Sequence, residues 1–304
     1  MKTIDYHGWK ALEIESGKAR LTVPLDIGPR VLACRLGDGA NLFHNVNEEL
    51  GGTDEPEWKL RGGHRLWTSP EHAVRTYDPD NQPVTVETPD ARCWAFQAPV
   101  DERTGIRKSM TIRSLGKGSF HLRHTLANEG LWPVETAPWA LTVMERGGLG
   151  ALPLPPRGSH PHDLLPIYSL VPWSYTDLSH PVWQFHKDFI GIDTTKSEPP
   201  QKLGITQYPG WSLYWQPGGT FVKYAAVDPA KTYPDLGCAY ETFCNDFMLE
   251  METLGPLETL EPGATVHHDE YWGVFGDWPK PSSDAVFSDA IKPAVDAWLA
   301  ELKT

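Results

Sequence analysis

The stretch CAYETFCNDFMLEMETLGPLETLEPGATVHHDEYWGVF, from Cys238 to Phe275, carries the strongest structural signal in this chain. It predicts two adjacent strands, residues 248–253 and 264–275, separated by Leu-Gly-Pro and a Glu-Pro-Gly turn. Side chains two apart in a strand share a face, so Glu250 and Glu252 point the same way. If that face is buried, the two carboxylates repel and the pKa of at least one of them rises. A solvated face, on which the pair has no special role, is the alternative.

Strand-like patterns continue through the chain to about residue 275, and they predict an all-β protein of antiparallel sheets. Residues 146–166 are rich in Gly and Pro and predict a long loop. Helical spacing occurs only at about 288–302, which predicts a short C-terminal helix. Without internal repeats, low-complexity tracts or linkers, residues 1–304 are expected to form one domain. The predicted strands are 11–15, 19–24, 30–36, 84–86, 92–97, 108–114, 120–127, 135–144, and a hairpin of 210–216 with 220–227.

Composition excludes several classes of protein. A formal net charge of -13 argues against nucleic acid and anionic membrane surfaces as partners. No stretch approaches the roughly 20 apolar residues of a membrane span, and the N-terminus lacks the apolar core of a secretory signal. The four cysteines lack paired spacing and are expected to be reduced core residues, which favours a cytoplasmic protein. The sequence does not indicate an oligomeric state.

Thirteen tryptophans are the most unusual feature of the composition. Tryptophan offers a flat apolar face and an N–H donor, whereas a purely apolar core could be built from Leu and Val. Sugar rings have apolar C–H faces and polar rims, so a tryptophan-rich cleft suits them. Core packing accounts for most of the thirteen, and three or four are expected to line a site.

Several segments, taken together, resemble the galactose mutarotase (aldose 1-epimerase) superfamily over nearly the whole chain. The resemblance implies an antiparallel β-supersandwich with an open cleft that binds a small carbohydrate. The GGHRLW motif is similar to the family's Asn-Arg-Ile-type motif, so Arg65 matches its sugar-contacting arginine and His64 replaces the asparagine. The similar segments are LEIESGKARLTVPLDIGPRVLACRLGDGANLF (12–43), GGHRLW (62–67), FHLRHTLANEGLWPVETAPWALTV (120–143) and TFVKYAAVDPAKTYPDLGCAYETFCN (220–245).

The resemblance also implies a reaction, the interconversion of sugar anomers. A base takes the proton of the anomeric hydroxyl, an acid protonates the ring oxygen, and no metal or organic cofactor is needed. Met-Glu-Thr is similar to the family's Leu-Glu-Thr, so Glu252 is the expected base, with Glu250 as the rival on the same face. Glu241 is expected to bind sugar hydroxyls. The family's acid is a histidine, but Trp139 stands at the corresponding place in this chain.

His64 and His72, which flank Arg65, are therefore the best candidates for the acid. Lys223 lies within an apolar strand, where an unpaired charge is costly, so it is expected to pair with Glu241 or another site acid, or to face solvent at an edge. Pairing with a site acid would place Lys223 among the substrate-binding candidates, with Trp139 and Glu250.

Other residues have weaker claims to a functional role. His124 shares an apolar strand face and fits a core histidine, and His267 and His268 must point to opposite faces of their strand. His160 and His162 lie among prolines, which favours a solvated turn over a metal site. No metal, nucleotide or nucleophile-elbow motif is present.

Three functions are left open by the sequence. They are an aldose 1-epimerase-like enzyme, a carbohydrate-binding module without catalysis, and another sugar-active enzyme such as a lyase or hydrolase, for which paired carboxylates would matter more.

Overall fold

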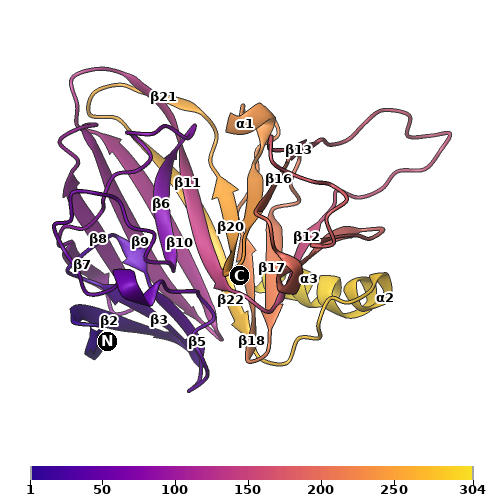
Figure 1. Cartoon of the computed structure of the whole chain (residues 1–304), viewed down its shortest axis with the longest axis horizontal. Coiled ribbons are helices and arrows are strands. Elements are labelled where there is room, and N and C mark those ends of the chain that lie inside the picture. Colours follow the sequence, from indigo (N-terminus) through magenta and orange to yellow (C-terminus); the bar gives the residue numbers. More distant parts are fainter. Residues whose placement is uncertain (1, 303–304) are drawn as a thin grey trace.

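A computed structural model of the protein describes residues 2–302. Three antiparallel sheets account for most of the fold, and the two larger ones lie against each other (Figure 1). The all-β class and antiparallel sheets predicted from strand alternation are confirmed. Within residues 2–302, no helix is long and apolar enough to cross a membrane.

The largest sheet has ten strands and runs across the whole molecule. In order of hydrogen-bonded neighbours these are β14 (Trp183–Phe185), β15 (Phe189–Asp193), β12 (Leu149–Pro153), β17 (Trp211–Gln216), β18 (Gly219–Tyr224), β22 (Thr265–Phe275), β10 (Ser119–Asn128), β9 (Ile106–Gly116), β8 (Cys93–Val100) and β7 (Thr85–Asp90).

The second sheet has eight strands and carries most of the residues expected at the site. Its order is β13 (Leu170–Pro172), β16 (Gln201–Ile205), β19 (Tyr240–Cys244), β20 (Met248–Leu254), β11 (Val134–Glu145), β6 (His64–Ser69) and β4 (Arg30–Val31), and β21 (Glu258–Leu260) pairs with β11. The N-terminal sheet is a four-stranded meander of β1 (Lys2–Tyr6), β2 (Trp9–Ser16), β3 (Ala19–Pro24) and β5 (Ala33–Leu36).

The two strands predicted from the opening stretch belong to different sheets. β20 lies in the eight-stranded sheet and β22 in the ten-stranded sheet, so they face each other across the interior rather than pairing edge to edge. The turn between them is formed as expected, with Gly263 at a φ of 83°, a left-handed conformation that glycine adopts without steric cost. Gly218, at a φ of 105°, plays the same part in the β17–β18 hairpin.

The prediction of one long loop at 146–166 was wrong. The first part of this Gly- and Pro-rich region forms β12, which lies between β15 and β17 in the ten-stranded sheet. Neighbouring side chains occupy the space that larger residues would need there: a Cβ on Gly150 would lie 3.2 Å from Ile192. The glycine content therefore marks close packing in a strand rather than a loop. The remainder of the region is an exposed connection, which projects from the upper right of Figure 1.

The C-terminal helix covers the outer face of the ten-stranded sheet (Figure 1). It begins as α2 (Asp284–Val286), capped by the Ser283 side chain, continues through a π-helical turn at Phe287–Ile291, and ends with α3 (Lys292–Glu301). The C-terminal helix predicted at about 288–302 is confirmed: the apolar residues of its helical spacing, Ile291, Val295 and Trp298, are buried, and Leu299 is partly buried. The other helical segments are short: η1 (Asn47–Glu49), η2 (Thr194–Lys196) and α1 (Pro234–Gly237).

The main core fills the space between the sheets. Apolar side chains of the ten-stranded sheet, such as Phe120 and Trp272, pack with Leu249 and Met251 of β20 and with Leu21 of the N-terminal sheet. All four cysteines are buried and form no disulfide, as expected of core residues.

Candidate functional site

The eight-stranded sheet presents two different faces because side chains alternate along each strand. Arg65, Leu141 and Glu252 are paired across β6, β11 and β20, so their side chains lie on one face of the sheet. Glu250, two residues before Glu252, lies on this face as well. This outer face bears a cleft of about 450 Å³.

Aromatic rings form much of the wall of this cleft. Four of the thirteen tryptophans line it, which matches the three or four expected from the sequence. Flat rings of this kind can stack on the apolar face of a sugar. The full lining is Trp58, Leu60, Arg65, Trp67, Glu71, Tyr77, Trp139, Leu141, Trp173, Tyr175, Lys202, Phe243, Asn245, Met248 and Glu250.

Arg65 is held in place by one carboxylate and two indole rings. Its Nη2 donates to Glu250 Oε1 at 2.9 Å, and its guanidinium carbon lies 4.2 Å from the centroid of Trp67 and 5.4 Å from that of Trp58. The remaining guanidinium nitrogens, Nε and Nη1, have no hydrogen-bond partner within residues 2–302. Arg65 therefore keeps donors that are not used by the protein itself.

Glu252 lies directly behind the cleft wall. Its Oε2 accepts a hydrogen bond from Trp139 Nε1 at 2.9 Å and another from Lys202 Nζ at 3.1 Å. Its Oε1 has no partner in the described part of the chain. The tryptophan that replaces the expected histidine thus fixes the orientation of the candidate base.

Lys202 connects the cleft to a second buried carboxylate. Its Nζ lies 2.9 Å from Glu241 Oε2, and its ammonium group lies 4.7 Å and 4.6 Å from the ring centroids of Trp139 and Trp173. Burial alone would lower the pKa of Lys202, but the carboxylates of Glu252 and Glu241 raise it above its ordinary range. Lys202 is therefore positively charged.

One ammonium group cannot neutralise two buried carboxylates. Burial raises the pKa of Glu241 well above its ordinary value, and the nearby Glu252 carboxylate adds to that effect. Burial also raises the pKa of Glu252, against the opposing effect of Lys202. Both carboxylates therefore hold a proton more readily than an exposed glutamate does, Glu241 the more strongly, while each also contacts Lys202.

Two tyrosines offer proton donors at the cleft. Tyr77 donates to Glu71 Oε1 at 2.5 Å, and burial together with that carboxylate raises its pKa to about 12. Tyr175 is half-exposed, and burial raises its pKa to about 12 while Lys202 opposes the shift. Both hydroxyls keep their protons at neutral pH.

The structure does not bring the two candidate histidines to the cleft. His64 alternates with Arg65 along β6, so its side chain points to the interior, where it is fully buried. His72 lies on the exposed loop after β6, and its Nδ1 accepts from the backbone N–H groups of Val74 and Arg75. Among residues 2–302, no histidine lines the cleft.

Lys223 also points to the interior and pairs with neither Glu241 nor solvent. Its Nζ lies 2.8 Å from Glu270 Oε1 and donates to the backbone carbonyls of Ala140 and Met251 at 2.9 and 3.0 Å. The sequence argument was right that such a lysine needs a partner, but it missed that β22 supplies the carboxylate from the opposite sheet.

The remaining histidine predictions agree with the structure. His124 is a fully buried core residue, and His267 and His268 do lie on opposite faces of β22, one exposed and one buried.

Sequence reasoning missed Lys202, Trp173 and Tyr175. The available signal was the excess of acidic residues: three glutamates at 241, 250 and 252 on one buried face require more than Arg65 to balance them. Lys202, in the strand next to Glu241, supplies that charge.

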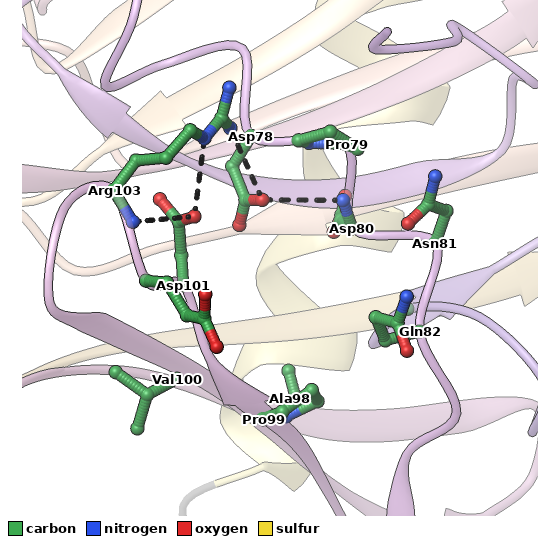
Figure 2. A pocket seen from close by; sticks show the side chains of 12 residues that line it. Asp78, Pro79, Asp80, Asn81, Gln82, Ala98, Pro99, Val100, Asp101 and Arg103 are labelled. Carbon is green, nitrogen blue, oxygen red and sulfur yellow. Dashed lines mark hydrogen bonds and ion pairs between the residues drawn. The ribbon is translucent and has the colours of Figure 1, made fainter. Parts of the chain in front are cut away.

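A second, polar pocket of about 500 Å³ lies beside the cleft, just after Tyr77 in the chain. Figure 2 shows Arg103 between the carboxylates of Asp78 and Asp101, at 3.6 and 3.3 Å. The Nζ atom of Lys108 also lies 3.3 Å from Asp78 Oδ2. Asp78 and Asp101 of the pocket thus pair with Arg103, and Asp80 pairs with Arg30 at 3.4 Å, which suits a structural role for these groups.

Comparison with known proteins gives a likeness in structure but not in sequence. No protein-family model and no curated protein matches this chain. A protein of Synechocystis sp. PCC 6803 is similar in structure, with a TM-score of 0.60, 13% identity, and coverage of 91% of this chain and 100% of that one. A galactose mutarotase-like protein from Lactobacillus casei ATCC 334 has a TM-score of 0.59 at 9% identity, covering 87% and 99% of the two chains.

A galactose mutarotase-like protein from Clostridium acetobutylicum is also similar, with a TM-score of 0.51 at 8% identity and coverage of 90% of this chain and 97% of that one. Identities this low carry information about the fold alone. Together with the sheet topology, they show that this chain has the galactose mutarotase-like fold.

Proposed function

We propose that this protein binds a sugar or sugar derivative in the tryptophan-lined cleft and interconverts its anomers, as an aldose 1-epimerase-like enzyme. The observation that carries the proposal is a pair of carboxylates on one sheet face: Glu250 lines an aromatic cleft together with Arg65, and Glu252 lies directly behind the cleft wall. The predicted cytoplasmic location and the absence of nucleic-acid and membrane partners remain predictions.

The lining of the cleft supports sugar recognition. Trp67 and Trp139 pack edge to face, with centroids 5.3 Å apart, which gives two differently inclined apolar surfaces. Around them, Arg65, Glu71, Glu250 and the tyrosine hydroxyls supply donors and acceptors for a polar rim. A few placed polar groups in a largely aromatic cleft are typical of small-molecule sites.

Glu252 is the proposed base. Its unpartnered Oε1 can accept the proton of the anomeric hydroxyl, while Trp139 and Lys202 hold Oε2 and fix the plane of the carboxylate. Raised pKa values suit a general base that works near neutral pH. Glu250 is the alternative, because it lines the cleft directly, although Arg65 occupies its Oε1.

The proton donor to the ring oxygen is proposed to be the hydroxyl of Tyr175. Tyr175 lines the cleft, and the charges of Lys202 and Glu252 both affect the pKa of its hydroxyl, so this hydroxyl is close enough to interact electrostatically with the proposed base. In the forward direction Tyr175 protonates the ring oxygen as Glu252 takes the hydroxyl proton, and the roles reverse when the ring closes.

Anomer-exchange NMR on a panel of aldoses, uronic acids and sugar phosphates tests this proposal. We expect Glu252→Gln to lower the enzyme-catalysed exchange rate by about 10²–10⁴-fold while sugar affinity stays nearly unchanged, since a general base contributes that much. Glu250→Gln tests Glu250 as the alternative base. If Glu252 is the base, this variant should mainly weaken sugar binding, because it removes the ion pair between Glu250 and Arg65. Glu258→Gln, a surface carboxylate paired with Lys231, is the matched control.

A non-catalytic carbohydrate-binding module is a second candidate, favoured by one observation: Glu252 has no exposed surface beneath Trp139 and Lys202. Wild-type protein that binds a sugar but leaves its anomer exchange at the solvent rate would support this candidate and reject the enzyme.

A further inference from the structure

Three potential ligand atoms converge in the interior, on the opposite side of the eight-stranded sheet from the cleft. His64 on β6, His124 on β10 and Glu270 on β22 are all fully buried. His64 Nε2 lies 3.2 Å from His124 Nε2, His124 Nε2 lies 3.3 Å from Glu270 Oε2, and His64 Nε2 lies 3.7 Å from the same oxygen. The point equidistant from three atoms so spaced is about 2 Å from each, which is the length of a bond from zinc to histidine or carboxylate.

The orientation of the two imidazoles agrees with such a centre. Their ring centroids are 4.9 Å apart, compared with 3.2 Å between the Nε2 atoms, so the rings are inclined toward each other rather than stacked side by side. Two rings with this separation can direct their Nε2 lone pairs to a common point about 2 Å away.

Surrounding groups fix the candidate ligands. His64 Nδ1 lies 2.9 Å from Thr142 Oγ1, a contact that allows Nδ1 to carry the proton and leaves Nε2 as a lone pair. Trp272 Nε1 donates to Glu270 Oε2 at 3.0 Å, which leaves one lone pair of that oxygen for another partner. His124 Nδ1 has no partner within residues 2–302, and the polar contacts of this ring, to His64 Nε2 and Glu270 Oε2, are both made by Nε2, the atom that would bind the ion.

The charge of the cluster sets a limit on affinity. Lys223 holds the other oxygen of Glu270, Oε1, at 2.8 Å, but its ammonium group is also bonded to two backbone carbonyls. The carboxylate is therefore shared between Lys223 and the candidate centre, and the two imidazole Nε2 atoms supply the other two ligands. Imidazole ligands favour zinc, iron and the later first-row ions over magnesium or calcium.

We propose that His64, His124 and Glu270 form a binding site for a divalent first-row transition-metal ion, zinc or iron, which connects the two large sheets from within. Because the three side chains have no exposed surface, the ion enters as the sheets come together during folding. It has no part in the cleft chemistry, for which no metal was expected.

Metal analysis of the full-length protein tests the site. The purified chain is unfolded in urea with a chelator, refolded with Zn²⁺, Fe²⁺, Co²⁺ or no added metal, freed of loose ions, and analysed by mass spectrometry. We expect close to one ion per chain, held by the native protein against a chelator, and for Co²⁺ the visible absorption of a low-symmetry coordinated ion. His64→Gln and His124→Gln should each remove most of the bound metal.

His268→Gln is the matched control, because His268 is another buried interior histidine, stacked 6.3 Å from His124 but outside the three-atom centre. Its metal content should stay at the wild-type level. Wild-type protein that refolds with no more metal than His64→Gln, or a His268→Gln variant that loses the ion equally, would overturn the proposal. Wild-type protein that folds and carries Co²⁺ without the visible bands would overturn it too, and this readout does not depend on any variant folding.

Discussion

The two faces of the eight-stranded sheet use charged side chains in opposite ways. On the cleft face, Lys202 serves two carboxylates and Arg65 keeps unused donors, so the charges are incompletely matched. On the inner face, Lys223 and Glu270 form a single close pair, and Lys223 has two further backbone acceptors. An incompletely matched site can respond to a ligand, whereas a buried ion pair between facing sheets helps to hold the sheets together.

The largest expected effect concerns the matched pair. Replacing one partner leaves the other as an unpaired buried charge. Lys223→Met should therefore lower the free energy of unfolding by about 3–5 kcal/mol. Urea unfolding in the presence of a chelator measures it. The double variant Lys223→Met/Glu270→Gln removes both charges and should recover part of the loss; a double variant as unstable as the single one would break the comparison.

A smaller effect of opposite sign is expected on the cleft face. Folding raises the pKa of Glu241, whose neighbours are Lys202, Glu252 and Asp235, so the native state retains a proton that the unfolded chain releases near pH 4.5. Stability therefore falls as the pH rises from 4.5 toward the higher native pKa. Glu241→Gln, which mimics the protonated acid, should be more stable than the wild type at pH 8, because its neutral side chain does not depend on a bound proton.

Denaturation of wild type and Glu241→Gln at pH 5 and pH 8 checks this expectation. The stability difference should shrink at the lower pH. A Glu241→Gln protein that is equally destabilised at both values would mean that Lys202 needs the ionised Glu241, and that the cleft charges are matched after all.

The smallest effect is expected at an exposed pair. Lys231 and Glu258 are about half and one-third exposed and lie 2.9 Å apart. Lys231→Ala should change the unfolding free energy least of the three variants, and the small loss should disappear in high salt. A loss as large as that of Lys223→Met would show that burial does not distinguish these pairs.

Much of the fold could be predicted because alternation survives wherever one face of a strand is buried. The hairpin of β17 and β18, the β10 strand and the C-terminal helix all follow from local periodicity and turn residues. β12 could not, because its glycines are required by neighbouring side chains that are distant in sequence. The assignment of β20 and β22 to separate sheets likewise depends on long-range packing.

The candidate site was only partly accessible to sequence reasoning. Glu250 and Glu252 were placed on one face by strand alternation, whereas Arg65 and Trp139 were assigned to the site by the resemblance to the mutarotase superfamily. His64 was assigned to the wrong face, because its neighbour Arg65 was counted with it although adjacent residues in a strand point in opposite directions. No sequence motif marks Lys202, and its role is apparent only from its contacts with Glu241 and Glu252 in the folded protein.

The alternation along β6 and β20 has a consequence for how such a sequence can change over time. A substitution alters one side chain, but inserting or deleting a single residue would exchange the faces, moving Arg65 and Glu252 inward and placing His64 and Thr253 in the cleft. These strands should therefore conserve their length far more strictly than their residues. That constraint is consistent with solved structures of 8–13% identity that still superpose on about nine-tenths of this chain.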